Sequence, residues 1–278
     1  MAGSLSKNEV EQYHQNGFLG PFPALSIDEV EQSRQALERF EAAEGATLGA
    51  LPGQLRAKTH LLFPWLNRLV RHPAILDAVE SLLGEDILLY HVTCWLKEPG
   101  DGAIVTWHQD GAYFNLDPPE HVTAWIALAD ATPQSGCMQV LPGSHRAGAL
   151  EHVMGDTRNN LLSNGQRVPG VEGEGAVYLA APSGHFTLHH THILHASGPN
   201  QANFRRIGIG ASYIPTAVRF NAPARVSATL VRGSDAYGYF DAEHSPSAEF
   251  DQQARLYHAS TVENFFAAHG SKRTADES

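Results

Sequence analysis

A histidine and an aspartate separated by one residue give this sequence its clearest chemical signal. They are His108 and Asp110, at the end of a run with the composition of a β-strand. Side chains two positions apart on a strand share one face, so the imidazole and the carboxylate are expected to point into the same interior. Because a His-x-Asp triplet is also common by chance as a surface hydrogen-bonded pair, a metal site requires a further ligand.

A histidine-rich stretch supplies the candidates for that ligand: His185, His189, His190, His192 and His195. We choose His195, because it closes an apolar strand and precedes a turn signal, Ala196 to Asn200, that returns the chain as an antiparallel neighbour. Alternation along a single strand over 186–195 allows only part of these histidines to face one cavity. His189 and His190 are expected to be groups around the metal ligands, substrate contacts or exposed side chains.

Two imidazoles and one carboxylate on one face of a metal ion leave three positions open, as in mononuclear non-haem Fe(II) oxygenases. A catalytic zinc site uses the same ligand types. The pair Arg205 and Arg206 follows His195 on the neighbouring predicted strand, and a planar guanidinium suits the distal carboxylate of 2-oxoglutarate. This pair favours iron over zinc, although two surface arginines would look the same in sequence.

The motifs around these residues resemble those of the phytanoyl-CoA dioxygenase family over most of the chain. The matching segments are Leu5-Ser6, Tyr13-x-x-x-Gly17-Phe18, Trp107 to Asp110, Ala124 to Leu128, Gly136 to His145, and His195 to Asn200 followed by Arg205-Arg206. The resemblance implies a double-stranded β-helix fold. It also implies which residues bind the cofactors: Fe(II) by His108, Asp110 and His195, and 2-oxoglutarate by Trp125, Ser197 and Arg205.

Two details depart from the family pattern. Family members usually carry Gly after the last iron histidine, where this chain has Ala196, a small change that leaves the assignment standing. The spacing from His195 to Arg205 looks one residue short, but Arg206 is expected to face the opposite way, so Arg205 is preferred.

The elements that must position these residues form a mainly β core with helices before and after it. Two capping boxes, Ser6 with Glu9 and Ser26 with Glu29, open the first helices, and a third helix starts at Pro73. Strand-like runs then occupy 87–97, 103–107, 122–129, 137–141, 176–179, 186–195 and 206–213. Helices before strands favour an antiparallel sandwich or barrel, here a jelly-roll or cupin-like double-stranded β-helix with N-terminal and C-terminal helices packed on one side.

We expect one domain over residues 1–270. Its parts are a helical portion over about 1–85, the β core over about 86–215, and a C-terminal loop and helix over about 216–270, followed by a frayed tail, 271–278. The long polar segments 112–121, 145–171 and 220–247 are typical of lids or binding loops.

Composition limits the partners. The formal charge of −11 and the absence of a clustered basic face disfavour nucleic acid. No signal segment or long apolar run is visible, which predicts a cytoplasmic protein with no membrane partner. The only cysteines, Cys94 and Cys137, lie in apolar stretches and are expected to be buried thiols. A homo-oligomer is left open.

The expected activity is hydroxylation of an unactivated C–H bond in a small-molecule metabolite or natural-product intermediate, consuming O2 and 2-oxoglutarate and releasing succinate and CO2. A non-catalytic binding protein on the same scaffold is the alternative. A halogenase is less favoured, because the Asp110 carboxylate fills the position that a halide would need. Net acidity mildly disfavours a large polyanionic substrate such as a CoA thioester.

Overall fold

The first helices begin where the capping residues predict. The computed structural model describes residues 3–249 and 251–270, so the expected tail at 271–278 lies outside the described residues. Ser6 and Ser26 cap α1 (Lys7–Asn16) and α2 (Ile27–Glu44), and each serine hydroxyl accepts a hydrogen bond from the backbone N–H three residues on. Both helices end at a glycine in the left-handed conformation, which an L side chain rarely adopts.

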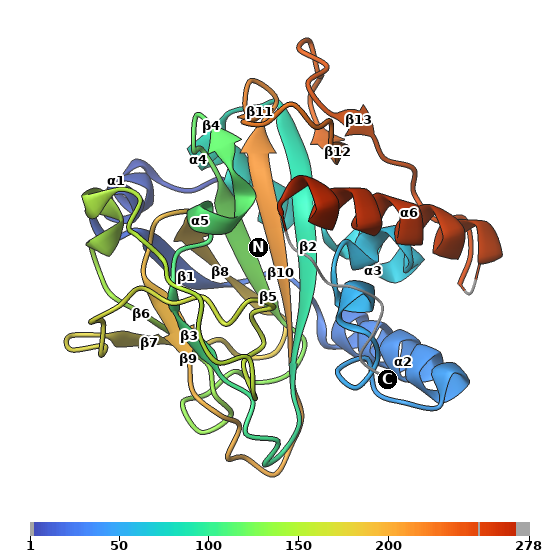
Figure 1. Cartoon of the computed structure of the whole chain (residues 1–278), viewed down its shortest axis with the longest axis horizontal. Coiled ribbons are helices and arrows are strands. Elements are labelled where there is room, and N and C mark those ends of the chain that lie inside the picture. Colours follow the sequence, from blue (N-terminus) through green and yellow to red (C-terminus); the bar gives the residue numbers. More distant parts are fainter. Residues whose placement is uncertain (1–2, 250, 271–278) are drawn as a thin grey trace.

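The strands form two main sheets that face each other (Figure 1). The larger sheet has the order β1 (Phe18–Pro23), β8 (His185–His190), β5 (Val122–Ala127), β10 (Arg206–Pro215), β2 (Ile87–Lys97), β12 (Ser227–Arg232) and β13 (Asp241–Ala242). The smaller sheet has the order β3 (Val105–His108), β9 (His195–Ser197), β6 (Met138–Val140) and β7 (Val177–Leu179), and a two-stranded ribbon joins β4 (Leu116–Asp117) to β11 (Arg219–Phe220). The prediction of a mainly β fold with a double-stranded β-helix core is confirmed.

Side chains on the central strands of the larger sheet alternate between an apolar outer face and an inner face that carries polar groups. On the outer face, apolar side chains such as Leu89, Ile126 and Ile209 pack against α2, α3 (Pro64–Leu69) and α4 (Pro73–Leu83) in one large core. The inner face, towards the smaller sheet, carries polar and aromatic side chains instead, among them Thr93, Trp95, Thr123, Trp125 and Arg206. The helices therefore stabilise the sheet from behind and leave its inner face available for a ligand site.

The C-terminal helix α6 (Gln252–Ala268) packs beside α2, where its Arg255 pairs with Glu44 at 2.6 Å. Its Phe265 packs against Tyr90, where β2 begins. Glu243, in the segment before α6, accepts hydrogen bonds from the buried Lys58 and His60 at 2.6 and 2.9 Å. Lys58 immediately precedes the short helix η2 (Thr59–Leu61), and His60 lies within it. The other short helices are η1 (Gly53–Arg56), α5 (Gly111–Phe114) and η3 (Ser144–Ala147).

Two local features differ from the sequence expectation. The stretch expected as one strand over 186–195 is broken: β8 ends at His190 and belongs to the larger sheet, whereas β9 begins at His195 in the smaller sheet. Strand β3 ends at His108, so Asp110 does not lie on it. Both breaks occur beside the cavity, where the chain crosses between sheets.

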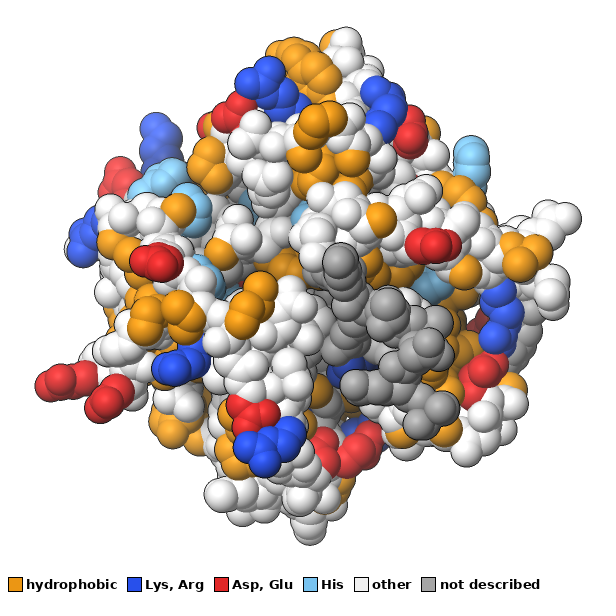
Figure 2. All heavy atoms as spheres, in the orientation of Figure 1, with side chains coloured by type: hydrophobic (Ala, Val, Ile, Leu, Met, Phe, Trp, Pro, Cys, Tyr) orange, Lys and Arg blue, Asp and Glu red, His pale blue; other side chains and the backbone are white. Residues whose placement is uncertain are grey.

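Within the described residues, no helix is both long and apolar enough to cross a membrane. Both cysteines are free and buried, as the apolar stretches around them predicted. On the face drawn in Figure 2, the coloured basic and acidic side chains lie in small mixed groups and form no broad basic patch.

Candidate metal centre and adjoining cavities

A strand end and a helix start bring His108 and Asp110 together. His108 is the last residue of β3, and Asp110 stands immediately before α5 with helical backbone angles. His195 opens β9, where it is the direct antiparallel partner of His108. The predicted convergence of the three residues is therefore found, but the alternation argument for the first two was wrong, because a helical turn rather than a strand carries the carboxylate.

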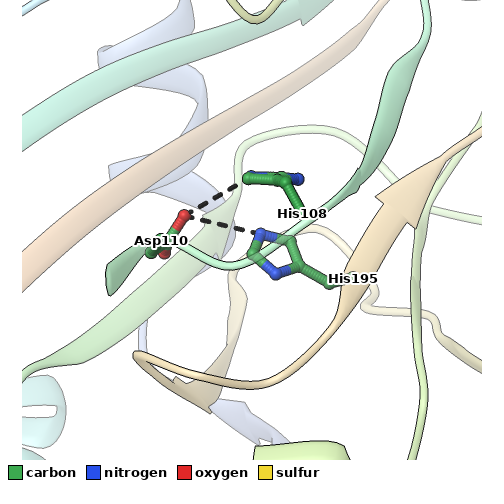
Figure 3. A group of neighbouring side chains, drawn as sticks. All are labelled: His108, Asp110 and His195. Atoms are coloured by element: carbon green, nitrogen blue, oxygen red, sulfur yellow. Dashed lines mark ion pairs between the residues drawn. The ribbon is translucent and has the colours of Figure 1, made fainter. Parts of the chain in front are cut away.

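The three side chains present a set of ligand atoms (Figure 3). Oδ1 of Asp110 lies 3.5 Å from Nε2 of His108 and 3.6 Å from Nε2 of His195, and the three ligand atoms lie within 4.8 Å of one another. Both imidazoles are buried. Two nitrogen donors and one carboxylate oxygen at this spacing can hold a single divalent ion on one face.

Backbone carbonyls orient both imidazoles for this task. Nδ1 of His108 lies 2.8 Å from the carbonyl oxygen of Thr106, and Nδ1 of His195 lies 3.1 Å from that of Ile193. A carbonyl only accepts, so each Nδ1 carries the hydrogen and each Nε2 offers its lone pair to the cavity. Burial lowers the pKa of His195 well below its usual value, which keeps that ring neutral and able to bind a metal.

The Asp110 carboxylate is held on the side away from the two ligand histidines. Its Oδ2 accepts hydrogen bonds from the hydroxyl of Thr123 at 3.0 Å and from Nε2 of His189 at 3.2 Å. Burial would raise the pKa of Asp110, but His195, His108 and His189 together hold that pKa well below its usual value. The carboxylate is thus ionised with Oδ1 directed at the metal position. From the sequence, His189 was expected to be a group around the metal ligands, a substrate contact or an exposed side chain. The choice among these was not possible, because the strand break after β8 is not visible in the sequence.

Gln109, between the two ligands, binds protein rather than metal. Its side-chain amide donates to the carbonyls of Gly148 and His192, and its side-chain oxygen accepts from the N–H of Leu150. This buried residue thereby fixes the loop after η3 and the turn before β9 around the metal position. Gln109 therefore holds in place the segments that surround the metal position.

One cavity, which we call the inner cavity, extends from the three ligand residues between the two sheets. Its far end is lined by Trp125, Ser197 and Arg206. The guanidinium carbon of Arg206 lies 5.5 Å from the centre of the Trp125 ring, and Arg206 donates to the carbonyl of Gly136 at 2.9 Å. Trp125 and Ser197, which the family resemblance implies as 2-oxoglutarate contacts, both line this cavity.

Arg205, in contrast, does not line the inner cavity. Its guanidinium is paired with Glu41 of α2 at 2.5 Å and with Glu98 at 2.6 Å, behind the larger sheet. The reason is strand parity: Arg206 opens β10 opposite Lys97 and shares its face with Gly208 and Gly210, which lie against the Trp125 and Trp95 rings. The structure thus places Arg206 in the inner cavity and Arg205, the residue preferred from the sequence, outside it. The spacing from His195 was the signal that pointed to Arg206.

The far end of the inner cavity suits an anion. Arg206 is buried, its Nε has no hydrogen-bond partner, and no carboxylate of the described residues forms an ion pair with it. Burial lowers the pKa of Arg206 to about 10, a value at which the guanidinium is still charged at neutral pH. A buried cation without a counter-ion is costly, so a ligand with a terminal carboxylate fits this end of the cavity.

A second cavity, the outer chamber, meets the inner cavity at His108 and Asp110. The two share the residues His91, Thr93, Trp95, His108, Asp110 and Phe114. The outer chamber is lined by apolar groups such as Leu161, Leu162 and Phe266, together with a few polar ones: Arg56, Tyr113, Ser163 and Gln166. The three candidate ligand residues therefore lie where a cavity lined by a buried arginine adjoins a mainly apolar chamber.

Comparisons with known proteins agree with this geometry. The family model "Phytanoyl-CoA dioxygenase (PhyH)" matches residues 13–208. A probable alpha-ketoglutarate-dependent hypophosphite dioxygenase of Stutzerimonas stutzeri is 33% identical over 170 residues, which span 60% of this chain and 58% of that protein, under two thirds of its length. An L-proline trans-4-hydroxylase of Streptomyces griseoviridis is 28% identical over 225 residues, 73% of this chain and 84% of that protein.

A solved structure is also similar over nearly the whole chain. The apo form of the non-heme monooxygenase ThoJ is 34% identical, has a TM-score of 0.82, and covers 94% of this chain and 97% of its own. The expectation of an oxygenase that uses Fe(II) and 2-oxoglutarate is thus confirmed at the level of the family. Fold, ligand set and sequence similarity lead to one conclusion: the chain belongs to the phytanoyl-CoA dioxygenase family.

Proposed function

We propose that the chain hydroxylates an unactivated C–H bond of a small-molecule metabolite or natural-product intermediate. In this proposal His108, Asp110 and His195 hold Fe(II), and Arg206, Ser197 and Trp125 bind 2-oxoglutarate. The observation that carries it is the ligand set at the junction of the two cavities. Bound Fe(II) with 2-oxoglutarate and O2 supplies oxidative decarboxylation to succinate and CO2, coupled to oxidation of the substrate.

The residues of the inner cavity orient the cosubstrate. Arg206 offers a planar fork for the distal carboxylate, and the Trp125 ring, 5.5 Å away, limits the direction from which that carboxylate approaches. With the distal end held there, the keto acid end of 2-oxoglutarate is left for the metal position beside His195. This arrangement fixes both ends of one small dianion.

The outer chamber binds the substrate and excludes water. Its apolar residues, Leu161 and Leu162 from the long loop and Phe266 from α6, come from segments that close over the barrel. A reactive site of this kind needs such a cover, since water and stray protein groups would otherwise consume the oxidant. Arg56 is the one Lys or Arg among the described residues that line the chamber, which favours a small molecule over a CoA thioester, whose phosphates would need several cations.

Asp110 also favours hydroxylation over halogenation. Its carboxylate fills a ligand position, and hydrogen bonds from Thr123 and His189 fix it there. A halide beside this ionised carboxylate would meet like charge.

The test is anaerobic titration of Fe(II)-loaded protein with 2-oxoglutarate, followed by the visible charge-transfer band of the iron–2-oxoglutarate complex. We expect a band in the wild-type protein, no band in His108→Ala, and at least about 100-fold weaker 2-oxoglutarate binding in Arg206→Met, because two or more charge-assisted hydrogen bonds are lost. Arg205→Met is the matched control and should bind 2-oxoglutarate within about threefold of wild type.

Two outcomes would contradict the proposal. Folded, iron-loaded wild-type protein without a band would exclude the assigned cofactor pair. Equal loss of affinity in Arg205→Met and Arg206→Met would show that the inner cavity is not the cosubstrate site. Once the band is established, a screen of small carboxylic acids and amino acids tests the substrate class. For each compound, succinate and the hydroxylated product are both measured.

A further inference from the structure

A second buried cation, Lys97, lies next to two residues that line the inner cavity, Arg206 and Ser197, without lining the cavity itself. Lys97 is the last residue of β2 and the direct antiparallel partner of Arg206 at the start of β10. Directly opposed residues of an antiparallel pair project to the same face, so both side chains enter the space between the sheets. Lys97 is fully buried, and no ion pair among the described residues includes it.

The Lys97 ammonium is bound to the turn that carries Ser197. Its Nζ donates to the Ser197 hydroxyl oxygen at 2.7 Å, to the Ser197 carbonyl at 3.3 Å, and to the carbonyl of Gly198. The side-chain amide of Asn200 in turn donates to the carbonyl of Lys97 at 3.0 Å. The end of β2 and the turn after β9 are thus joined through the lysine.

These contacts decide the direction of the Ser197 hydroxyl. In its charged form, which an anion bound nearby favours, the lysine only donates, so the Ser197 oxygen acts as the acceptor and keeps its own hydrogen for another partner. Lys97 is the only recorded hydrogen-bond partner of this hydroxyl among the described residues, and Ser197 lines the inner cavity. The hydroxyl is therefore available to donate to a carboxylate held by Arg206.

The charge environment leads to the same ligand. Burial, with the adjacent positive charge of Arg206, lowers the pKa of Lys97 to about 7. The other titratable groups that act on Lys97 are Asp101, in the loop after β2, and the thiol of Cys137 before β6, and neither is close enough for an ion pair. Two neighbouring buried cations without a carboxylate are destabilising by themselves and are relieved by a bound anion.

We propose that Lys97 is a positioning residue for 2-oxoglutarate, which directs the Ser197 hydroxyl as a donor to the distal carboxylate and adds a second positive charge that selects a dianion over a monoanionic 2-oxo acid. This inference rests on the proposed function. Lys97 acts through the Ser197 hydroxyl and through its own positive charge. Replacing it should therefore change the affinity and selectivity for the cosubstrate and leave Fe(II) binding unchanged.

The experiment is an anaerobic titration of Fe(II)-loaded proteins with 2-oxoglutarate and, separately, with 2-oxopentanoate, which has the same keto acid end and no distal carboxylate. The proteins are wild type, Lys97→Met, Ser197→Ala, the double variant, and Lys97→Gln, which retains a donor but no charge. Fe(II) affinity without cosubstrate and the melting temperature are measured for each protein.

We expect Lys97→Met to weaken 2-oxoglutarate binding about 10- to 100-fold while 2-oxopentanoate binding stays within about threefold. Ser197→Ala should weaken 2-oxoglutarate binding about 10-fold, and adding it to Lys97→Met should cause little further loss, because the lysine acts through the serine. Lys97→Gln should lie between Lys97→Met and wild type. If Lys97→Met does not fold, Lys97→Gln and Ser197→Ala carry the test.

Asn200→Ala is the matched control, since it loosens the same turn without removing a charge. An equal loss of 2-oxoglutarate affinity in Asn200→Ala and Lys97→Met, or an equal loss for both 2-oxo acids in Lys97→Met, would show that Lys97 only stiffens the turn. Unchanged affinity in Ser197→Ala would also overturn the proposal. A wild-type protein without the charge-transfer band would instead contradict the proposed function itself, so the two failures are distinguishable.

Discussion

Nε2 of His189 lies 3.2 Å from Oδ2 of Asp110, on the side of the carboxylate away from the two ligand histidines. His189 comes from the larger sheet and Asp110 from the end of the smaller one, so this hydrogen bond spans the space between the sheets beside the metal position. Together with the Thr123 hydroxyl it leaves Oδ1 as the oxygen that faces His108 and His195.

Replacing His189 should therefore weaken the metal site. His189→Phe removes the donor that fixes the Asp110 carboxylate, and losses of this kind typically cost 10- to 100-fold in metal affinity. We expect Fe(II) binding to weaken by about that factor, measured anaerobically by competition with a chelator. His185→Gln, at the other end of β8, is the control. Equal iron affinity in His189→Phe and wild type would show that the carboxylate needs no such support.

Arg205 should matter for stability and not for the cosubstrate. Its guanidinium joins Glu41 of α2 to Glu98 after β2, and its side chain is 17% exposed. Arg205→Met leaves two acidic groups without their partner, which should lower the free energy of unfolding by about 1–3 kcal/mol. Urea denaturation measures this loss. An unchanged denaturation midpoint would mean that water replaces the pair at no cost.

Gly208 should be essential because of its closeness to Trp125. A Cβ added at Gly208 would lie 2.0 Å from the Trp125 ring, which has little freedom to move because it is buried. Gly208→Ala should displace the ring from Arg206, weaken 2-oxoglutarate binding at least about 10-fold, and cost about 1–3 kcal/mol of stability.

The control for this change is Gly198→Ala, near the same cavity, where an added Cβ meets nothing within 4 Å. Both variants are assayed by the 2-oxoglutarate titration and by urea denaturation. A tight cosubstrate site in Gly208→Ala would show that the ring position is not decisive.

Mild acid should destabilise the fold through His258. This α6 residue is buried and donates to the carbonyl of Ala57 at 2.8 Å, and burial lowers its pKa from 6.5 to about 4. Between these values the unfolded chain binds a proton that the folded chain does not, so stability falls as pH drops through this range.

The expected loss from His258 between pH 7 and pH 4 is about 3 kcal/mol, at about 1.4 kcal/mol for each unit of pKa difference. Urea denaturation at several pH values measures it. His258→Gln retains a donor and cannot titrate, so its stability should vary less steeply between pH 6.5 and 4. Parallel pH profiles for the two proteins would contradict the assignment.

The sequence alone indicated the candidate ligands and the family. His108, Asp110 and His195 could be chosen because only certain side chains bind Fe(II), and the motifs around them are long enough to exclude chance. Capping boxes located the first helices, since a capping serine and its glutamate satisfy backbone groups locally and need no tertiary contact. The run Ile87 to Lys97 was predicted with its observed limits, because β-branched and aromatic residues dominate it.

Only the tertiary structure decided which face each side chain presents. The choice of Arg206 over Arg205 depends on where β10 begins, and one residue of shift in a strand exchanges its two faces. His189 reaches Asp110 because the chain leaves the larger sheet after His190 and joins the smaller one at His195, a break that an unbroken run of histidines and apolar residues does not reveal. Lys97 lies beside Ser197 although 100 positions separate them, because pairing between distant strands, and not local sequence, sets which groups meet.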